Sequence, residues 1–175
     1  MKQILWMIAL LALVGCGKKP AEESVFEQGR PNVTKPSKPS AKTEAQIEAE
    51  TKFFAETKAK AEEGDATGQY NLGLMYAKGE GVEQDFKEAF KWFQKTADQG
   101  NAAAQANLGR MYANGEGVLQ DYETAYAWWD IAATNGNQNA KNNKSIIAGE
   151  MTPDQITKAE ELVKEMVKKN PKLLK

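Results

Sequence analysis

Four carboxylates in two short, glycine-flanked segments are the residues best placed for acid–base or cation chemistry. Glu80 and Asp85 recur 36 residues later as Glu116 and Asp121. Paired carboxylates can act as general acid and base. An aspartate directly before a helical pattern is also a preferred helix N-cap. Because both carboxylates recur together with the segment around them, the sequence predicts turns and helix caps here, and no catalytic residues.

Side chains that other chemistries require are scarce in this chain. Its 175 residues contain no histidine and one cysteine, Cys16. This composition excludes His-based triads, histidine-liganded zinc and Cys-x-x-Cys pairs. No GxxxxGK[ST], GxSxG or HExxH motif occurs. A net charge of −1 provides no basic excess for nucleic acid. We therefore expect no enzyme, metal, small-molecule cofactor or nucleic-acid partner.

The segments that carry these residues recur at a fixed interval. Gly64, Gly100 and Gly136 are each 36 residues apart, and residues 64–99 and 100–135 are identical at 18 of 36 aligned positions. A fixed period in the thirties is typical of stacked helical repeats. Alanine, lysine, glutamate and glutamine are plentiful whereas valine and isoleucine are sparse, which also favours helix over sheet.

Residues 66–78 predict the first helix of a repeat. Leu72, Gly73 and Tyr76 fall on one helical face. The Gly-Glu-Gly segment at 79–81 should end this helix, because glycine readily takes the left-handed conformation of a helix cap. A glycine in mid-helix costs about 1 kcal/mol relative to alanine. We therefore expect Gly73 to let a neighbouring helix approach closely.

The second helix of the repeat should follow Asp85 and end at Gly100. Asp85 is its expected N-cap, with Glu88 completing a capping box. The expected buried stripe contains Trp92 together with Ala89, Phe93 and Ala97. Residues expected to pack the repeats are Leu72, Gly73, Tyr76 and Trp92, with their counterparts Leu108, Gly109, Tyr112 and Trp128.

The pattern LGxMYxxGxGVxQDxxxAxxWxxxxA, present at 72–97 and 108–133, resembles the Sel-one-like repeat, a relative of the tetratricopeptide repeat. This resemblance covers about residues 50–168. It implies an all-α fold: a short right-handed α/α solenoid of helix pairs with capping helices. In solenoids of this family the first helix of each pair lines a concave surface on which protein partners dock.

The first sixteen residues have the features of a targeting signal. Lys2 supplies a positive charge, and residues 4–14 are apolar throughout but too short to span a bilayer. The segment that follows, Leu13-Val14-Gly15-Cys16, resembles a bacterial lipobox, in which the chain is cleaved before the cysteine and the cysteine is lipidated. By the same resemblance, Gly17 suggests the outer membrane, facing the periplasm. We therefore expect a lipid-anchored protein of the cell envelope.

The remaining segments supply a tether and end caps. Residues 17–41 are rich in proline and poor in apolar residues, as in a disordered linker. Phe53, Phe54 and Ala61 lie one period before Ala89, Phe90 and Ala97, which suggests a second helix without its first. The expected parts are a signal peptide at 1–15, the lipidated cysteine and linker at 16–43, an N-terminal capping helix at 44–63, repeat 1 at 64–99, repeat 2 at 100–135, and a partial repeat with a closing helix at 136–170.

Positions that differ between the repeats are candidates for partner binding. Residues 67, 70, 74 and 78 step by three or four, so they share one helical face. The hypothesis is a protein-binding groove formed by Tyr70, Leu74, Lys78, Arg110 and Asn114. Four aromatic residues could be exposed anchors or edge packing, and the sequence leaves both possibilities open. They are Tyr70, Phe93, Tyr126 and Trp129.

The leading functional hypothesis is a membrane-anchored interaction module, a scaffold or adaptor that binds a protein partner of unknown identity. The alternative is a periplasmic immunity or inhibitor lipoprotein that neutralises a toxin or enzyme, since some lipoproteins with such repeats resemble immunity proteins. An envelope hydrolase is disfavoured, because the disulfide-rich relatives credited with that activity have repeat cysteines that this chain lacks. The lysine-rich end, residues 164–175, should solvate a helix end; the alternative is that it recruits membrane or peptidoglycan.

Overall fold

The computed structural model describes residues 42–174 of the chain. The expected signal peptide, Cys16 with its lipobox residues Leu13, Val14 and Gly15, and most of the linker lie outside these residues. Within 42–174 all regular structure is helical, as expected from the repeat pattern. The elements are α1 (Glu44–Glu62), α2 (Ala66–Lys78), α3 (Phe86–Ala97), α4 (Ala102–Asn114), α5 (Tyr122–Thr134), α6 (Gln138–Ala148), α7 (Pro153–Lys169) and the 3₁₀ turn η1 (Pro171–Leu173).

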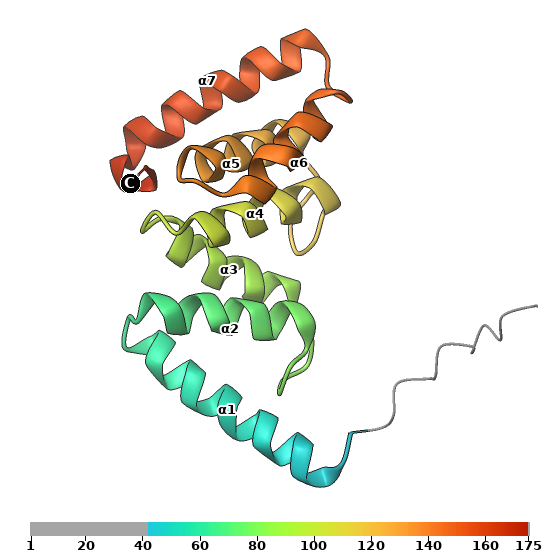
Figure 1. The fold of residues 1–175 in the computed structure, drawn as a ribbon, viewed down its shortest axis with the longest axis vertical. Coiled ribbons are helices and arrows are strands. Elements are labelled where there is room, and N and C mark those ends of the chain that lie inside the picture. The colour runs from blue at the N-terminus through green and yellow to red at the C-terminus, as the bar shows by residue number, and fades with distance from the viewer. Residues whose placement is uncertain (1–41, 175) are drawn as a thin grey trace, which may run out of the picture. The chain divides into compact units, whose positions relative to one another are not determined.

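Successive helices pack side by side as antiparallel neighbours in a stack (Figure 1). Helices α2 and α3 form the hairpin of repeat 1, and α4 and α5 form that of repeat 2. Helix α1 packs on α2, and α6 packs on α5. Helix α7 departs from this order because it packs along α5. No helix in the described part of the chain is both long and apolar enough to cross a membrane.

The predicted caps at Asp85 and Asp121 are confirmed. Asp85 Oδ1 accepts hydrogen bonds from the backbone of the first turn of α3 at 2.8 and 3.1 Å, and Asp121 Oδ1 does the same for α5 at 3.0 and 3.1 Å. The predicted capping box with Glu88 is wrong. The backbone N–H of Asp85 donates instead to the carbonyl of Tyr76 at 2.9 Å, and the Glu88 carboxylate pairs with Lys91.

The mid-helix glycines bring the two helices of each hairpin together, as predicted. A Cβ atom on Gly73 would lie 2.8 Å from the ring of Phe93, and one on Gly109 would lie 2.5 Å from the indole of Trp129. These distances are shorter than carbon atoms tolerate. Glycine is therefore required at both positions for a ring of the second helix to pack directly on the backbone of the first.

The glycine loops bind each repeat to the helix before it. Gly81 and Gly117 have φ of +72° and +73°. A Cβ on Gly81 would overlap the carbonyl oxygen of Glu50 in α1, and one on Gly117 would lie 2.5 Å from the carbonyl oxygen of Phe86 in α3. Each loop therefore rests on the second helix of the preceding unit, and α1 serves as that helix for repeat 1.

An aromatic contact also recurs between neighbouring units. Phe54 of α1 meets Tyr76 of α2 edge to face, with ring centroids 5.5 Å apart. Phe90 of α3 meets Tyr112 of α4 in the same way at 5.7 Å. Because Phe54 and Phe90 are 36 residues apart, α1 presents the same ring to its neighbour as α3 does.

Helix α7 and η1 close the C-terminal end of the stack. Thr152 caps α7 in a capping box with Gln155. Leu173 is 2% exposed and belongs to the same buried cluster as Phe93, Leu108 and Trp128. The chain after α7 therefore turns back and completes the core between the two repeats.

Candidate functional site

Two adjoining hollows lie on the face formed by the first helices of the hairpins. One has a volume of about 310 Å³ and lies between α2, α4 and α6; the other, of about 210 Å³, lies between α4, α5 and α6. They share Arg110 and Asn143. The first is lined by Tyr70, Ala103, Ala106, Asn107, Arg110, Asn137, Asn139 and Asn143. The second is lined by Arg110, Asn114, Trp129, Asn143, Ile146 and Ile147.

Asparagine is the most frequent residue of the lining, and two of the lining asparagines follow the repeat. Asn71, Asn107 and Asn143 occupy the same position in α2, α4 and α6, 36 residues apart. Asn107 Nδ2 donates to the carbonyl of Ala103 at 3.0 Å and reaches the Tyr70 hydroxyl at 3.5 Å. The backbone of α4 thus orients this side chain along the wall of the hollow. An amide offers both a donor and an acceptor, the pair that an extended polypeptide backbone also presents.

Arg110 is held between the two hollows by a neighbouring carboxylate. Its guanidinium forms an ion pair with Glu116, whose other oxygen accepts a hydrogen bond from Asn114 Nδ2 at 2.8 Å. The Arg110 side chain retains 39% of its exposure. Glu116 thus fixes the arginine and offsets its charge, so the hollows carry little net charge. The first hollow is lined largely by amides, whereas Trp129, Ile146 and Ile147 make the second largely apolar.

The five residues predicted for partner binding do not all meet there. Tyr70, Arg110 and Asn114 line the hollows. Leu74 is half-buried and packs against the core, as Tyr70 also does in part. Lys78 is exposed and lies 3.5 Å from Glu80. The helical face that contains residues 67, 70, 74 and 78 is therefore partly turned into the core in α2. The hollows lie mainly beside α4 and α6 instead.

Sequence reasoning missed Asn107, Asn139, Asn143 and Ile146 as lining residues. A signal was available for two of them, because Asn107 and Asn143 continue the period that begins at Asn71. Ile146 had no comparable signal. Its side chain is 65% exposed, and it replaces Arg110 of the preceding repeat.

The aromatic residues left open by the sequence pack within the fold. Phe93 is fully buried, Trp129 and Tyr126 are 6% and 7% exposed, and the ring of Tyr70 lies 5.8 Å from that of Phe93. Trp128 is buried. Trp92 differs from the expected buried stripe: it is half-buried, with Lys95 Nζ 4.6 Å from its ring centroid.

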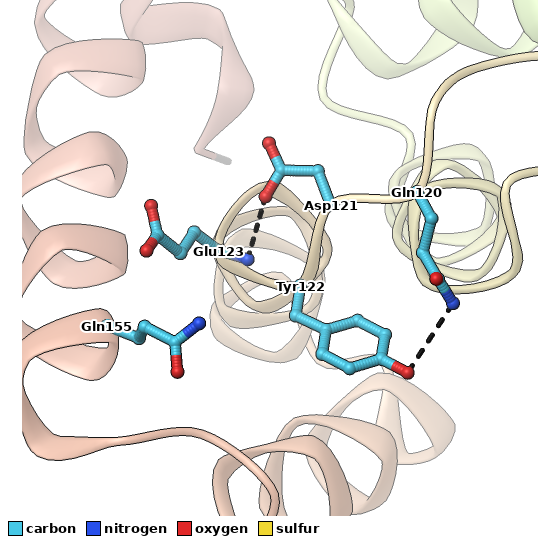
Figure 2. A pocket seen from close by; sticks show the side chains of 5 residues that line it. All are labelled: Gln120, Asp121, Tyr122, Glu123 and Gln155. Carbon is cyan, nitrogen blue, oxygen red and sulfur yellow. Dashed lines mark hydrogen bonds between the residues drawn. The ribbon is translucent and has the colours of Figure 1, made fainter.

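A third hollow, of about 360 Å³, lies where the α4–α5 loop faces the start of α7 (Figure 2). Gln120, Asp121, Tyr122, Glu123 and Gln155 line it. Its aspartate is committed to capping α5, and Gln120 Nε2 donates to the carbonyl of Ala113 at 2.7 Å and to the Tyr122 hydroxyl at 3.4 Å. Within residues 42–174 no group of three or more His, Cys, Asp or Glu side chains could hold a metal ion.

One partly buried ion pair marks the end of the repeats. Lys144 stands where Leu108 stands in the preceding repeat, and its Nζ lies 2.7 Å from Asp130 Oδ1 and 5.4 Å from the ring centroid of Tyr126. The hydrogen bond to Asp130 raises the pKa of Lys144 against the opposing effect of burial. Burial raises the pKa of the Tyr126 hydroxyl. An ion-paired lysine thus stands in α6 at the position that a fully buried leucine fills in α4.

The hairpins, their glycine contacts and their loops define an α/α solenoid of helical repeats. Residues 66–101 and 102–137 match the family model of the Sel1 repeat. The two central hairpins are therefore Sel1 repeats, with the period that the sequence predicts and boundaries two residues later. This is the Sel-one-like repeat expected from the LGxMY pattern.

Solved structures agree with this assignment. A protective antigen present in uropathogenic Escherichia coli strains, which displays an SLR fold, is 36% identical over 70% of this chain, with a TM-score of 0.66. A Sel1 repeat protein from Oxalobacter formigenes is 33% identical over 55% of this chain, with a TM-score of 0.52. The matches span 27% and 40% of those two proteins. No curated protein matches the chain.

Proposed function

We propose that this protein is a lipid-anchored interaction module of the bacterial cell envelope, a scaffold or adaptor that binds an extended segment of a partner protein. The observation that carries the proposal is the pair of adjoining hollows across α2, α4 and α6. Asn107 and Asn143, one repeat period apart, and Arg110 line these hollows, so α4 and α6 both offer hydrogen-bonding groups there. A Sel1-repeat solenoid is generally a protein-interaction fold, which favours a protein partner.

Location in the envelope rests on the lipobox-like segment that ends at Cys16. Lipidation there and the linker that follows would place the solenoid outside the cytoplasm, within reach of a membrane. The description of the Escherichia coli relative as a protective antigen also fits a protein outside the cytoplasm. Labelling of cells with radioactive palmitate tests this part of the proposal. The label should be lost in Cys16→Ser, and labelling that persists in the variant would refute it.

The two adjoining hollows form the proposed binding groove. Affinity capture of partners from detergent-solubilised envelopes tests it. The variant Arg110→Glu/Asn143→Ala should lose the partner, because it reverses the fixed charge and removes one amide of the row. Lys91→Glu is the matched control, since it makes the same charge change on the exposed side of α3. Equal melting temperatures of the variants would show that the loss concerns binding.

Two results would contradict the groove. If Arg110→Glu/Asn143→Ala captured the partner as well as Lys91→Glu does, the interface would lie elsewhere. Turnover of an envelope substrate by the purified protein would replace a binding role with an enzymatic one. The identity of a captured partner separates two roles: a toxin would favour the immunity alternative, and an assembly or secretion component would favour the adaptor.

A further inference from the structure

The C-terminal turn shows how a short segment docks on the edge of a repeat. The carbonyl oxygen of Leu173 accepts hydrogen bonds from Gln105 Nε2 at 2.9 Å and from Asn135 Nδ2 at 2.6 Å. Asn170 Nδ2 donates to the carbonyl of Asp98, at the end of α3, at 3.0 Å. The Leu173 side chain is buried. A leucine-bearing turn is thus held by two side-chain amides and one carbonyl at a helix end.

Repeat 1 carries the same amide pair. Gln69 and Gln99 stand 36 residues before Gln105 and Asn135. Gln99 Nε2 donates to Gln69 Oε1 at 3.0 Å, as Asn135 Nδ2 donates to Gln105 Oε1 at 2.8 Å. The amide of Gln99 also donates to the carbonyl of Lys95 at 3.2 Å, where that of Asn135 donates to Leu173. Gln69 Nε2 donates to the end of α1 at 3.3 Å, as Gln105 Nε2 donates to the end of α3 at 3.2 Å. The carbonyl of Glu62, which ends α1, is the counterpart of the carbonyl of Asp98.

The repeat 1 edge differs in what lies over it. Gln105 Nε2 makes a second hydrogen bond, to Leu173, whereas the structure gives Gln69 Nε2 one bond within residues 42–174 although its residue is only 5% exposed. Helix α7 packs on α5, and Trp92 of α3 stays half-buried where Trp128 of α5 is buried. A buried amide with one remaining hydrogen therefore faces an edge that carries a partly exposed indole.

We propose that this edge, formed by Gln69, Gln99, Trp92 and the carbonyl of Glu62, binds a leucine-bearing turn of a partner protein. The ligand has the chemistry of residues 170–174: an amide donor for the Glu62 carbonyl, a leucine beside Trp92, and a leucine carbonyl for Gln69 Nε2, whose amide group Gln99 holds in place. The edge shares no residue with the groove on the first helices, so a partner could engage either surface alone.

Lys95 opposes this docking. It stands where Ile131 stands in repeat 2 and lies over Trp92. A docked leucine must displace this ammonium group, which makes the site weaker than its counterpart. Lys95→Ile should therefore tighten binding about threefold to tenfold, since the added apolar contact contributes on the order of 1 kcal/mol.

The test uses the full chain, labelled with ¹⁵N, and an acetylated peptide with the sequence of residues 170–175. The expected result is a saturable shift of the Trp92 indole and of the Gln69 and Gln99 side-chain amides. The peptide should bind more weakly to Gln99→Ala and more tightly to Lys95→Ile. Lys91→Ala, on the same exposed side of α3, should have no effect. A peptide with alanine in place of its first leucine should not bind.

Three outcomes would overturn the inference. The first is no saturable shift at millimolar peptide in either the native chain or Lys95→Ile. The second is a shift confined to Gln105 and Asn135, which would mean that the peptide only exchanges with the chain's own C-terminal turn. The third is a shift at Asn107 and Asn143, which would assign the peptide to the groove.

Discussion

Repeat 1 and repeat 2 have the same backbone plan but fill the space between their helices differently. In repeat 1 the ring of Phe93 packs on Gly73 and is flanked by Tyr70. In repeat 2 the larger indole of Trp129 packs on Gly109, and the position of Tyr70 is taken by Ala106, whose carbonyl accepts a 3.1 Å hydrogen bond from the indole. In repeat 2, one large ring from the second helix thus fills the space that two rings, one from each helix, fill in repeat 1.

The two repeats also differ on their outer side. Trp92 and Trp128 are the same residue one period apart, yet Trp128 is 4% exposed and Trp92 is half-buried. Helix α7 packs on α5 and has no counterpart over α3. Identical residues therefore set the hairpin, whereas the elements beyond the repeat decide whether a given side chain belongs to the core.

The largest difference between the repeats should come from removing these two tryptophans. Trp128→Ala should lower the free energy of unfolding by about 3–5 kcal/mol, the usual cost of deleting a buried aromatic side chain. Trp92→Ala should cost about 1 kcal/mol, because it loses partial burial and the contact with Lys95. Urea denaturation of both variants measures the two values. Equal losses would mean that α7 does not bury Trp128 in solution.

The glycine loops should show the next largest effect. Gly81→Ala should cost about 2–4 kcal/mol, since it combines left-handed strain with overlap against Glu50. Gly64→Ala is the matched control: its φ is +96°, but no atom lies within 4 Å of the added carbon. It should cost about 1 kcal/mol from strain alone. The same denaturation experiment decides, and a Gly81 variant as stable as the control would contradict the seating of the loop on α1.

Exchange of the aromatic packing tests whether the two solutions are interchangeable. Tyr70→Ala and Phe93→Trp together give repeat 1 the side chains of repeat 2. The double variant should be more stable than the sum of the single losses predicts, by about 1–2 kcal/mol, because the cavity left by one change receives the ring added by the other. A double-mutant cycle in urea measures this coupling, and a coupling of zero would show that the two packings need different backbones.

The ion pair of Lys144 and Asp130 should contribute the smallest difference, about 1 kcal/mol or less. The folded protein raises the pKa of Lys144 above 10.5, so the folded state binds the proton more tightly than the unfolded state. The stabilisation is therefore complete below pH 10.5 and is lost as pH rises through the raised pKa. In Lys144→Met the free energy of unfolding, measured by denaturation, should fall less as pH rises through this range. In the control Lys164→Met it should fall as in the unchanged protein.

Much of the fold could be predicted because its determinants are local. The period, the caps at Asp85 and Asp121 and the need for Gly73 all follow from short-range chemistry. The capping box failed because the N–H of Asp85 is used by Tyr76, nine residues away. The exposure of Trp92 could not be predicted, since it depends on where α7 packs.

The groove was predictable only in part for a similar reason. Spacing grouped residues on one side of a helix, but it could not say how far that side turns toward the core. Leu74 packs inward, whereas Arg110 lines the hollows. Asn107 and Asn143 carry the repeat signature, whereas Ile146 breaks the period and is recognised only in three dimensions.

Each glycine loop rests on the second helix of the unit before it. This limits how such a chain can change length in evolution. A duplicated stretch of 36 codons taken from within residues 64–135 would supply a new loop together with a new helix for the next loop to rest on. Every contact of the type made by Gly81 and Gly117 would then be reproduced. An insertion of any other length would separate a loop from its support, so gain and loss of whole units is the growth that this architecture tolerates.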